Sequence, residues 1–137
     1  HMTNAAYVTA FDIASVALLH HVGIDPEYRA RQRCSTFALE LHTVFHRELA
    51  PRAPYLIETR VIDFDAKRIH LFHQMKNAEE GFLAASLEVV TIHVDLDKRR
   101  SAPLPENIVE ELKRFRGVSD SLGWPESAGR RVGWKAN

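Results

Sequence analysis

The chain has 137 residues, enough for one domain that buries about two thirds of the surface its unfolded form exposes. Its 18 Lys and Arg balance 18 Asp and Glu and 45% of its residues are apolar, which excludes a strongly basic nucleic-acid binder and predicts a globular domain without nucleic-acid or membrane partners. The lone Cys34 excludes an internal disulfide, and the lack of a signal-peptide pattern predicts the cytoplasm.

Residues 5–22 are predicted to form an apolar helix. Apolar side chains recur there at spacings of three and four, the pattern of a helix with one buried face; they are Tyr7, Phe11, Ala14, Ala17, Leu18 and Val22. Thr3 or Asn4 can cap the start of this helix, and Gly23 can end it. Residues 25–34 are polar and lack periodicity, so we expect a connecting loop there.

Alternating side chains predict a strand that begins near residue 36 and ends before Pro51. One face is expected to carry Phe37, Leu39, Leu41 and Phe45, and the other Glu40, His42 and His46. The later elements are two strands joined by a hairpin at 65–67, a turn, a long strand, a short amphipathic helix and an irregular tail. Their expected ranges are 55–64, 68–76, 77–81, 82–94, 106–115 and 117–137.

One long apolar helix followed by four antiparallel strands is typical of an α+β domain whose sheet wraps around the helix. Small residues at 84–86 let a helix or a ligand approach the last strand closely. A sheet of this kind leaves an unpaired edge, so we expect a homodimer or a homotetramer.

The opening segment His1-Met2-Thr3-Asn4-Ala5-Ala6-Tyr7 resembles the second half of the active-site motif of hotdog-fold acyl-CoA thioesterases, Asp-x-x-Gly-His-[Val/Met]-x-Asn-x-x-Tyr. Later motifs follow in a similar order, with Leu-His-His-Val-Gly-Ile at 19–24, Glu-Leu-His-Thr-Val-Phe at 40–45, Val-Asp at 94–95 and Ala-Pro-Leu-Pro at 102–105. The resemblance covers residues 1–116. It implies a hotdog fold, an antiparallel sheet wrapped around one long central helix, and an enzyme that hydrolyses acyl-CoA without a metal or redox cofactor.

The catalytic Asp of this family lies four residues before the motif His, a position ahead of residue 1. The first strand of the fold is also expected ahead of residue 1. His1 holds the place of the motif His, although a His-Met pair is also a common cloning remnant without a role. We therefore expect this chain to hydrolyse thioesters weakly unless an internal carboxylate acts as the base.

Thioester hydrolysis needs a carboxylate that activates water or attacks the carbonyl, and donors that hold the oxyanion. N–H groups at a helix start are suitable donors, and the Asn4 amide can orient the carbonyl or the water unless it caps the helix. By analogy with the family, Glu40 is the best internal carboxylate, with His42 on the same face of its strand. Asp12 on the helix is another candidate, and each also fits a purely structural role.

Coenzyme A brings phosphates, which require basic side chains nearby. Two clusters qualify, Lys67 with Arg68 at the hairpin and Lys98, Arg99 and Arg100 after the last long strand, although such clusters often only face solvent. The eight histidines lack the spacing of a zinc site, so we expect no metal.

Residues 34–37, 64–73 and 129–133 resemble the subgroup of the family that acts on betainyl-CoA in carnitine breakdown. A trimethylammonium group binds an aromatic face beside a carboxylate, and Tyr7, Phe45 or the tail tryptophans could supply the face. Two other functions fit the same fold, a non-catalytic hotdog domain that binds acyl-CoA or dimerises, and a hotdog dehydratase.

Overall fold

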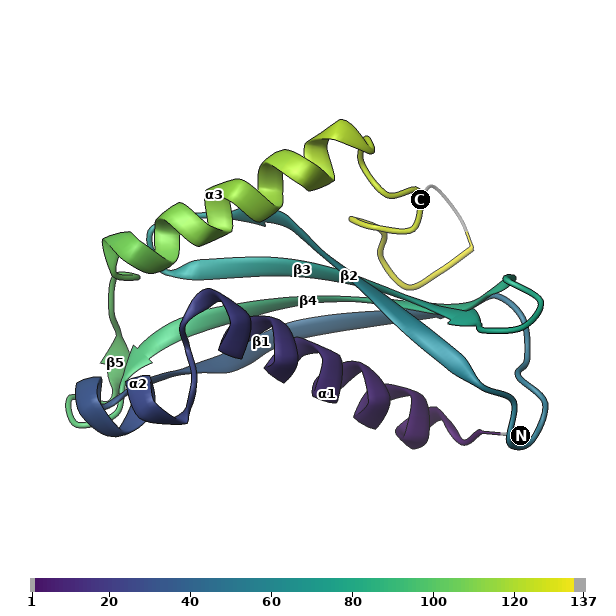
Figure 1. Cartoon of the computed structure of the whole chain (residues 1–137), viewed down its shortest axis with the longest axis horizontal. Helices are drawn as coiled ribbons and strands as arrows, with labels where there is room; N and C mark the ends of the chain where they lie inside the picture. The colour runs from purple at the N-terminus through teal and green to yellow at the C-terminus, as the bar shows by residue number, and fades with distance from the viewer. Residues whose placement is uncertain (1, 135–137) are drawn as a thin grey trace.

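A single antiparallel sheet curves around a long helix in the computed structural model, which describes residues 2–134 (Figure 1). The elements are α1 (Asn4–Val22), α2 (Pro26–Gln32), β1 (Cys34–Phe45), β2 (Tyr55–Phe64), β3 (Arg68–Asn77), β4 (Leu83–Asp95), β5 (Arg100–Ser101) and α3 (Glu106–Ser121). The sheet order is β1-β4-β3-β2, and β5 pairs with the end of β4. The expected α+β architecture, with the sheet around the helix, is confirmed.

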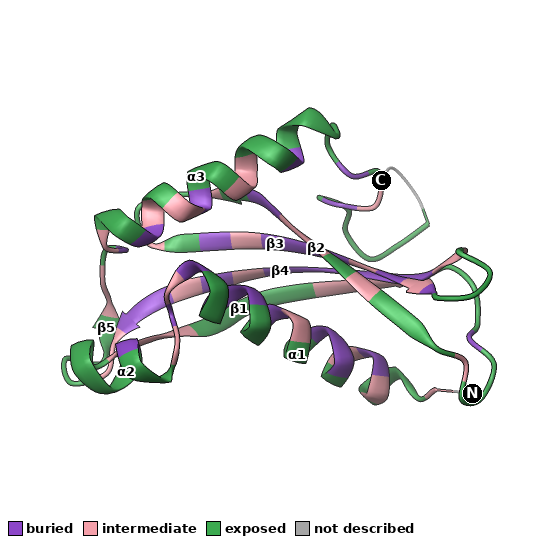
Figure 2. Cartoon of the chain, viewed as in Figure 1, coloured by how far each residue is buried: buried purple, intermediate pink, exposed green. Residues whose placement is uncertain are grey.

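Helix α1 begins one residue before the predicted start at residue 5 and ends at the predicted residue, Val22. Thr3 is the N-cap, its Oγ1 accepting the Ala6 N–H at 3.2 Å, and Gly23 ends the helix with a left-handed φ of 109°. The buried face of α1 packs on the sheet (Figure 2). Phe11 on this face is fully buried. Length and composition alone would let α1 cross a membrane, but the core helix of a globular domain passes the same test.

A buried polar chain lies under α1. Ser15, not the predicted Ala14 or Ala17, is buried on this face, and its Oγ lies 2.7 Å from His73 Nε2. The other ring nitrogen of His73 lies 2.8 Å from Thr59 Oγ1 on β2. A neutral imidazole satisfies both hydroxyls, because it donates from one nitrogen and accepts at the other. These two hydrogen bonds of His73 tie α1 to β3 and β2 through the core.

The prediction for the faces of β1 is wrong at Phe37. A bulge between Ala38 and Glu40 inserts one residue, so that Phe37 pairs with Ile92 and Leu41 with Val89. Ile92 and Val89 lie on opposite faces of β4, and therefore Phe37 and Leu41 do as well. The strand runs Cys34–Phe45, so it begins slightly before the predicted start near residue 36 and ends, as predicted, before Pro51.

The segment predicted as a loop at 25–34 contains helix α2. Asp25 caps it by accepting the Tyr28 N–H at 2.8 Å, and Pro26 occupies its first turn. The Tyr28 hydroxyl lies 2.8 Å from His93 Nε2, which fixes the helix against the end of β4. Burial raises the pKa of Tyr28 to about 12, so the hydroxyl keeps its proton.

Helix α3 continues beyond the predicted end at 115 and takes in the first residues of the expected tail. It packs against β2 through Ile108 and Leu112, both fully buried. Arg60 on β2 holds its last turn, donating from Nε to Ser119 Oγ at 2.9 Å and from its terminal nitrogen to the carbonyl oxygens of Ser119 and Gly123. This side chain from another element, which the local sequence does not reveal, extends the helix.

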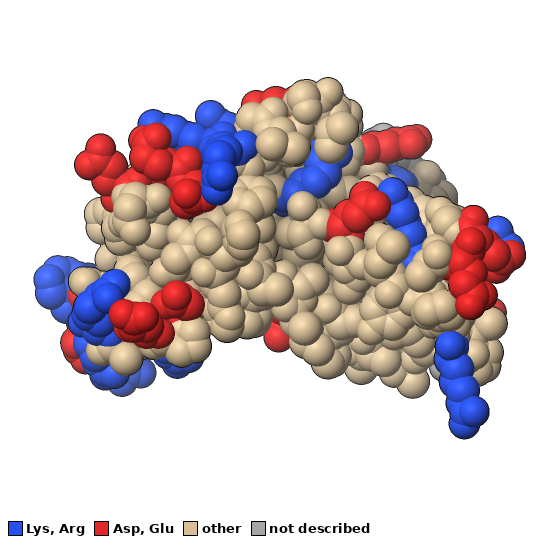
Figure 3. Space-filling model, in the orientation of Figure 1, with Lys and Arg blue, Asp and Glu red and all other residues tan. Residues whose placement is uncertain are grey.

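The free edge of β1 and the neighbouring face of α1 are apolar and exposed. Phe37, Leu39, Leu41 and Phe45 are each between 48% and 57% exposed, and Ile13 on α1 is 66% exposed. Charged side chains gather over α3 and at the end of the molecule that holds α2 and β5, whereas the surface over α1 is mostly uncharged (Figure 3). An open strand edge beside apolar surface is typical of an interface.

Candidate functional site

The N-terminus of α1 opens into a cavity of about 310 Å³. Its walls come from the helix start, the end of β1 and the start of β4, and the lining residues are Met2, Asn4, Tyr7, Phe45, His46, Arg47, Glu48 and Ala84. The structure therefore brings together three predicted site residues, Asn4, Tyr7 and Phe45. Arg47 and Glu48 were not predicted, because they lie in the segment after β1 that lacks a motif.

The first turn of α1 lies at this cavity through Asn4 and Tyr7. The first donors within α1 are the N–H groups of Ala6 and Tyr7, which both bond the Thr3 carbonyl, so the N–H groups of Asn4 and Ala5 precede the helical ladder. Thr3 performs the capping, which leaves the exposed amide of Asn4 without a capping role. The positive end of the helix dipole favours a negative oxygen here.

Two aromatic rings form one wall of the cavity. Tyr7 and Phe45 meet edge to face, with ring centroids 5.2 Å apart and an interplanar angle of 80°. Tyr7 is buried and anchors the pair, whereas Phe45 is 48% exposed. The guanidinium of Arg47 lies 4.0 Å from the centroid of Phe82, so its charge sits over that ring.

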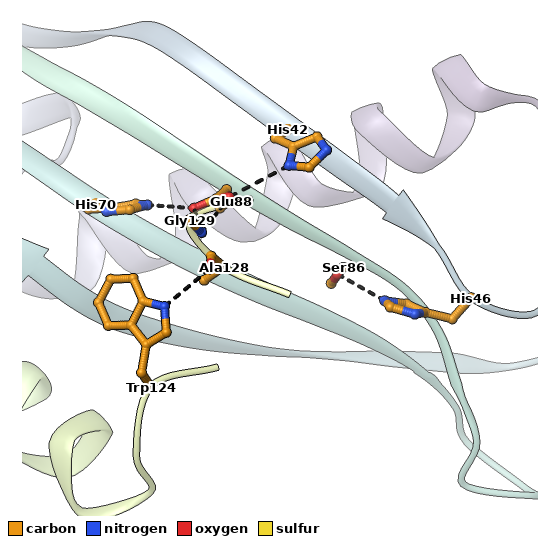
Figure 4. Close-up of polar contacts among 8 residues, drawn as sticks. All are labelled: His42, His46, His70, Ser86, Glu88, Trp124, Ala128 and Gly129. Atoms are coloured by element: carbon orange, nitrogen blue, oxygen red, sulfur yellow. Dashed lines mark hydrogen bonds and ion pairs between the residues drawn. The ribbon is translucent and has the colours of Figure 1, made fainter. Parts of the chain in front are cut away.

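His46 connects this cavity to the outer face of the sheet. Its Nε2 lies 3.1 Å from Ser86 Oγ (Figure 4). Burial and the nearby charge of Arg130 lower the pKa of His46, against a smaller opposing effect of Glu126. The ring therefore stays neutral at neutral pH and can accept or donate a hydrogen bond.

A second polar cluster lies on the outer face, across the sheet from α1. Glu88 is buried there and accepts hydrogen bonds from His70 Nε2 at 2.9 Å and from the Gly129 N–H at 2.9 Å (Figure 4). His42 Nδ1 lies 3.6 Å from the same carboxylate. Glu40 and Arg130 also line the cavity of about 320 Å³ beside this cluster. The contacts join three strands and the C-terminal segment, so no local motif indicates them.

The remaining catalytic candidates lie apart from the helix start. Glu40 and His42 face the outer cavity, and Asp12 lines a third cavity, of about 240 Å³, between α1 and β1. His1 lies outside the described residues. The structure thus does not bring Glu40, His42 or Asp12 to Asn4, and their catalytic roles stay predictions.

The two basic clusters lie at the end of the sheet opposite to the helix start, beside α2 and β5 (Figure 1). Lys67 Nζ donates to Ser101 Oγ at 3.2 Å, which links the clusters. Arg68 pairs with Asp65. The hydrogen bond from the Arg68 side chain is the largest cause that lowers the pKa of Asp65, to about 2, and the Lys67 and Arg68 N–H groups add to it. Lys98, Arg99 and Arg100 are exposed and stay candidates for phosphate contact.

Replacing Glu40 by alanine distinguishes the two faces of the sheet. Because Glu40 lies across the sheet from the helix start, we expect Glu40→Ala to change turnover with acyl-CoA esters by no more than about twofold. A fall of roughly 10- to 1,000-fold, the scale of a general base, would instead place the chemistry on the outer face.

No group of three or more His, Cys, Asp or Glu side chains that could hold a metal ion occurs within residues 2–134.

The model of the thioesterase-like superfamily matches residues 1–112 of the chain. A betainyl-CoA thioesterase of Pseudomonas aeruginosa is 32% identical over 133 residues, which are 97% of this chain and 84% of that protein.

An L-carnitine dehydrogenase/betainyl-CoA thioesterase of Agrobacterium fabrum is 32% identical over 96% of this chain, and the match spans 27% of that bifunctional protein. Among solved structures, a hypothetical protein of Staphylococcus aureus in complex with CoA superposes with a TM-score of 0.91 at 27% identity. That superposition covers 98% of this chain and 84% of the other. The match to the Agrobacterium fabrum protein and the superposition on the Staphylococcus aureus protein both cover nearly the whole of this chain.

Proposed function

The chain belongs to the thioesterase-like superfamily, has its hotdog fold and is a thioester hydrolase of the acyl-CoA class; we propose that its substrate is betainyl-CoA. The cavity at the start of α1 carries this proposal. It places the start of α1 with Asn4 and two aromatic rings around one space of about 310 Å³. The relative named betainyl-CoA thioesterase, similar over 84% of its length, supports the choice of acyl group.

In the proposed reaction the thioester carbonyl lies at the N-terminus of α1. The N–H groups of Asn4 and Ala5 and the Asn4 amide donate to the oxygen as it becomes negative, when a nucleophile adds to the carbonyl carbon. With water as the nucleophile, the activating carboxylate takes its proton, and collapse of the tetrahedral intermediate breaks the C–S bond. The proton passes to the departing thiolate, so that CoA and betaine are released. The activating carboxylate is proposed to come from the motif position ahead of His1, because Asp12 and Glu40 face other cavities.

The function is tested with a panel of CoA esters and the purified chain, extended ahead of His1 by an Asp-x-x-Gly segment that supplies the activating carboxylate. Release of free CoA thiol is followed with betainyl-CoA and with short straight-chain acyl-CoA esters. We expect betainyl-CoA to give the highest kcat/KM. Binding of CoA esters without thiol release would indicate the non-catalytic binding domain, and faster hydrolysis of a straight-chain ester would reject betainyl-CoA as the substrate.

We further propose that two copies pair antiparallel along β1. This pairing covers the exposed edge with its apolar side chains Phe37, Leu39 and Leu41. It also brings the cavity close to a basic cluster. Within one chain the 13 residues of β4 separate the helix-start cavity from the basic end by roughly 40 Å. An antiparallel partner brings its own basic end beside that cavity, where CoA phosphates could bind.

Light scattering tests the assembly. We expect the wild-type mass to be a multiple of 15.6 kDa, as a dimer or a tetramer, and we expect Leu39→Lys with Leu41→Lys to shift it towards 15.6 kDa. Val118→Lys changes another exposed apolar residue, on α3, and serves as the control. A wild-type mass of 15.6 kDa alone would reject the interface.

Neutralising Lys98, Arg99 and Arg100 together to glutamine should raise KM for the CoA ester with little change in kcat. Phosphate contacts far from the thioester stabilise the bound substrate and the transition state alike. Lys113→Gln, an exposed substitution on α3, is the control. An unchanged KM in the triple variant would remove this cluster from CoA binding.

The proposed reaction uses no metal or redox cofactor and takes place in the cytoplasm, where the single Cys34 stays reduced. The cofactor part is checked by dialysis against a chelator, after which we expect the rate to be unchanged.

A further inference from the structure

We propose that residues 123–131 form a C-terminal strap that belongs to the α1 cavity: Glu88 is the positioning residue that anchors the strap, and the anchored strap places Arg130 beside His46. The reaction described above gives neither Glu88 nor Arg130 a role. The inference deepens the proposed function, and its kinetic test rests on that function, whereas its structural test does not.

A buried carboxylate holds the strap on the outer face of the sheet. The Gly129 N–H donates to both oxygens of Glu88, at 2.9 and 3.0 Å. One residue earlier, Ala128 is buried against Ile62 and Phe72. A hydrogen bond to an ionised carboxylate is stronger than one between neutral groups. Glu88 therefore fixes the point from which the strap continues.

The register of β4 brings this anchor close to His46. Ser86 and Glu88 are two residues apart on β4, so they lie on the same face, roughly 7 Å from each other (Figure 4). His46 Nε2 lies 3.1 Å from Ser86 Oγ, and Arg130 follows the anchored Gly129 directly. Since His46 also lines the α1 cavity, a strap on the outer face reaches the site on the helix side.

The charges of the strap act on the protonation of His46. Burial lowers the pKa of this ring, the positive charge of Arg130 lowers it further, and Glu126 of the strap acts in the opposite direction. A neutral imidazole can donate or accept a hydrogen bond at the cavity, whereas a protonated one only donates. The other ionisable residues of the cavity wall are Tyr7 on α1, Arg47 and Glu48.

The structural test measures the pKa of His46 by NMR titration of the histidine ring protons, with His46→Gln identifying its signal. We expect Arg130→Gln to raise this pKa and Glu126→Gln to lower it. Arg130→Lys keeps the charge and should leave the pKa unchanged, as should Arg29→Gln at an exposed site on α2. Glu88→Ala should raise it. Loss of a negative charge alone would lower the pKa, so a rise reports that the strap has moved away.

Gly129→Ala tests the anchor from the strap itself and leaves the sheet untouched. The φ of Gly129 is 78°, a left-handed conformation that alanine rarely adopts. We expect trypsin to cut after Arg130 and Arg131 roughly 10-fold faster in Gly129→Ala and in Glu88→Ala than in the wild type, because the docked strap opens more often. Glu110→Gln on α3 should be cut at the wild-type rate.

The kinetic test uses the extended chain and follows kcat/KM for betainyl-CoA against pH. In Arg130→Gln the acid limb of this profile should move to higher pH, together with the pKa of His46. A pKa of His46 that stays the same in both Arg130→Gln and Glu88→Ala would overturn the strap, and a raised pKa with an unchanged profile would overturn its role in turnover. If the ester is not hydrolysed at all, the proposed function fails, while the titration still decides whether the strap governs His46.

Discussion

Replacing Asn4 by alanine is expected to lower kcat for the CoA ester by roughly 100-fold, the scale of one lost donor to an oxyanion. The side chain lines the cavity at the start of α1, beside N–H groups that precede the helical ladder. Asn4→Asp should lose a similar factor, because a carboxylate of the same size has no N–H to donate and repels the developing charge. Steady-state kinetics with thiol release measures both variants.

The neighbouring Thr3 provides the matched control. Thr3, and not Asn4, caps the helix, so Thr3→Ala should cost about 1 kcal/mol of stability and change kcat far less than Asn4→Ala does. Asn4→Ala should leave the free energy of unfolding nearly unchanged. The reverse pattern, with stability lost at Asn4 and activity lost at Thr3, would assign Asn4 to helix formation and exclude it from the reaction.

Elements with a long, regular pattern were predictable because local chemistry decides them. Helix α1 has spaced apolar residues and a glycine at the C-cap, where φ is 109° and few other residues fit. The hairpin at 65–67 follows from the short polar connection, and the Asp65 carboxylate accepts the N–H groups of Lys67 and Arg68 in the turn. In each case neighbours in the sequence supply the decisive contacts.

Elements fixed by distant partners were missed. Helix α2 has only seven residues, too few for periodicity, and it is held by the contact of Tyr28 with His93, 65 residues away. The end of α3 depends on Arg60, and the bulge in β1 appears only in its register with β4. A one-residue insertion exchanges the two faces of a strand, which is why alternation misplaced Phe37.

Some residues of the candidate site were predictable from the sequence, and others are brought together only by the fold. Asn4 and Tyr7 lie on one helix turn, and the predicted motif places them correctly at one cavity with Phe45. Alternation correctly placed Glu40 on the face opposite Leu41 and Phe45, and the structure shows that this is the outer face with Glu88, away from Asn4. Glu88 joins the outer cluster by accepting hydrogen bonds from His70 on β3 and from the Gly129 N–H of the C-terminal segment. The sequence pattern cannot indicate contacts between such distant residues.

The last prediction concerns the buried His73 and the stability of the fold in mild acid. In the unfolded chain this ring takes up a proton near its ordinary pKa of about 6.5, whereas burial lowers its pKa in the folded protein to about 4. Between these values the unfolded form holds one proton more than the folded form, so acid favours unfolding. The contribution is complete above pH about 6.5 and is lost as the pH falls to about 4, which amounts to roughly 3 kcal/mol.

Urea unfolding between pH 4.5 and 7.5, at one protein concentration, measures this slope. His73→Leu should flatten it and, because Ser15 and Thr59 then lose a partner, should cost roughly 2–4 kcal/mol at pH 7. Adding Ser15→Ala and Thr59→Val removes the orphaned hydroxyls and should recover part of that loss. His20→Gln, at an exposed histidine of α1, should keep the wild-type slope. If His73→Leu also keeps it, another group governs acid stability, and the neutral imidazole is not what the core requires.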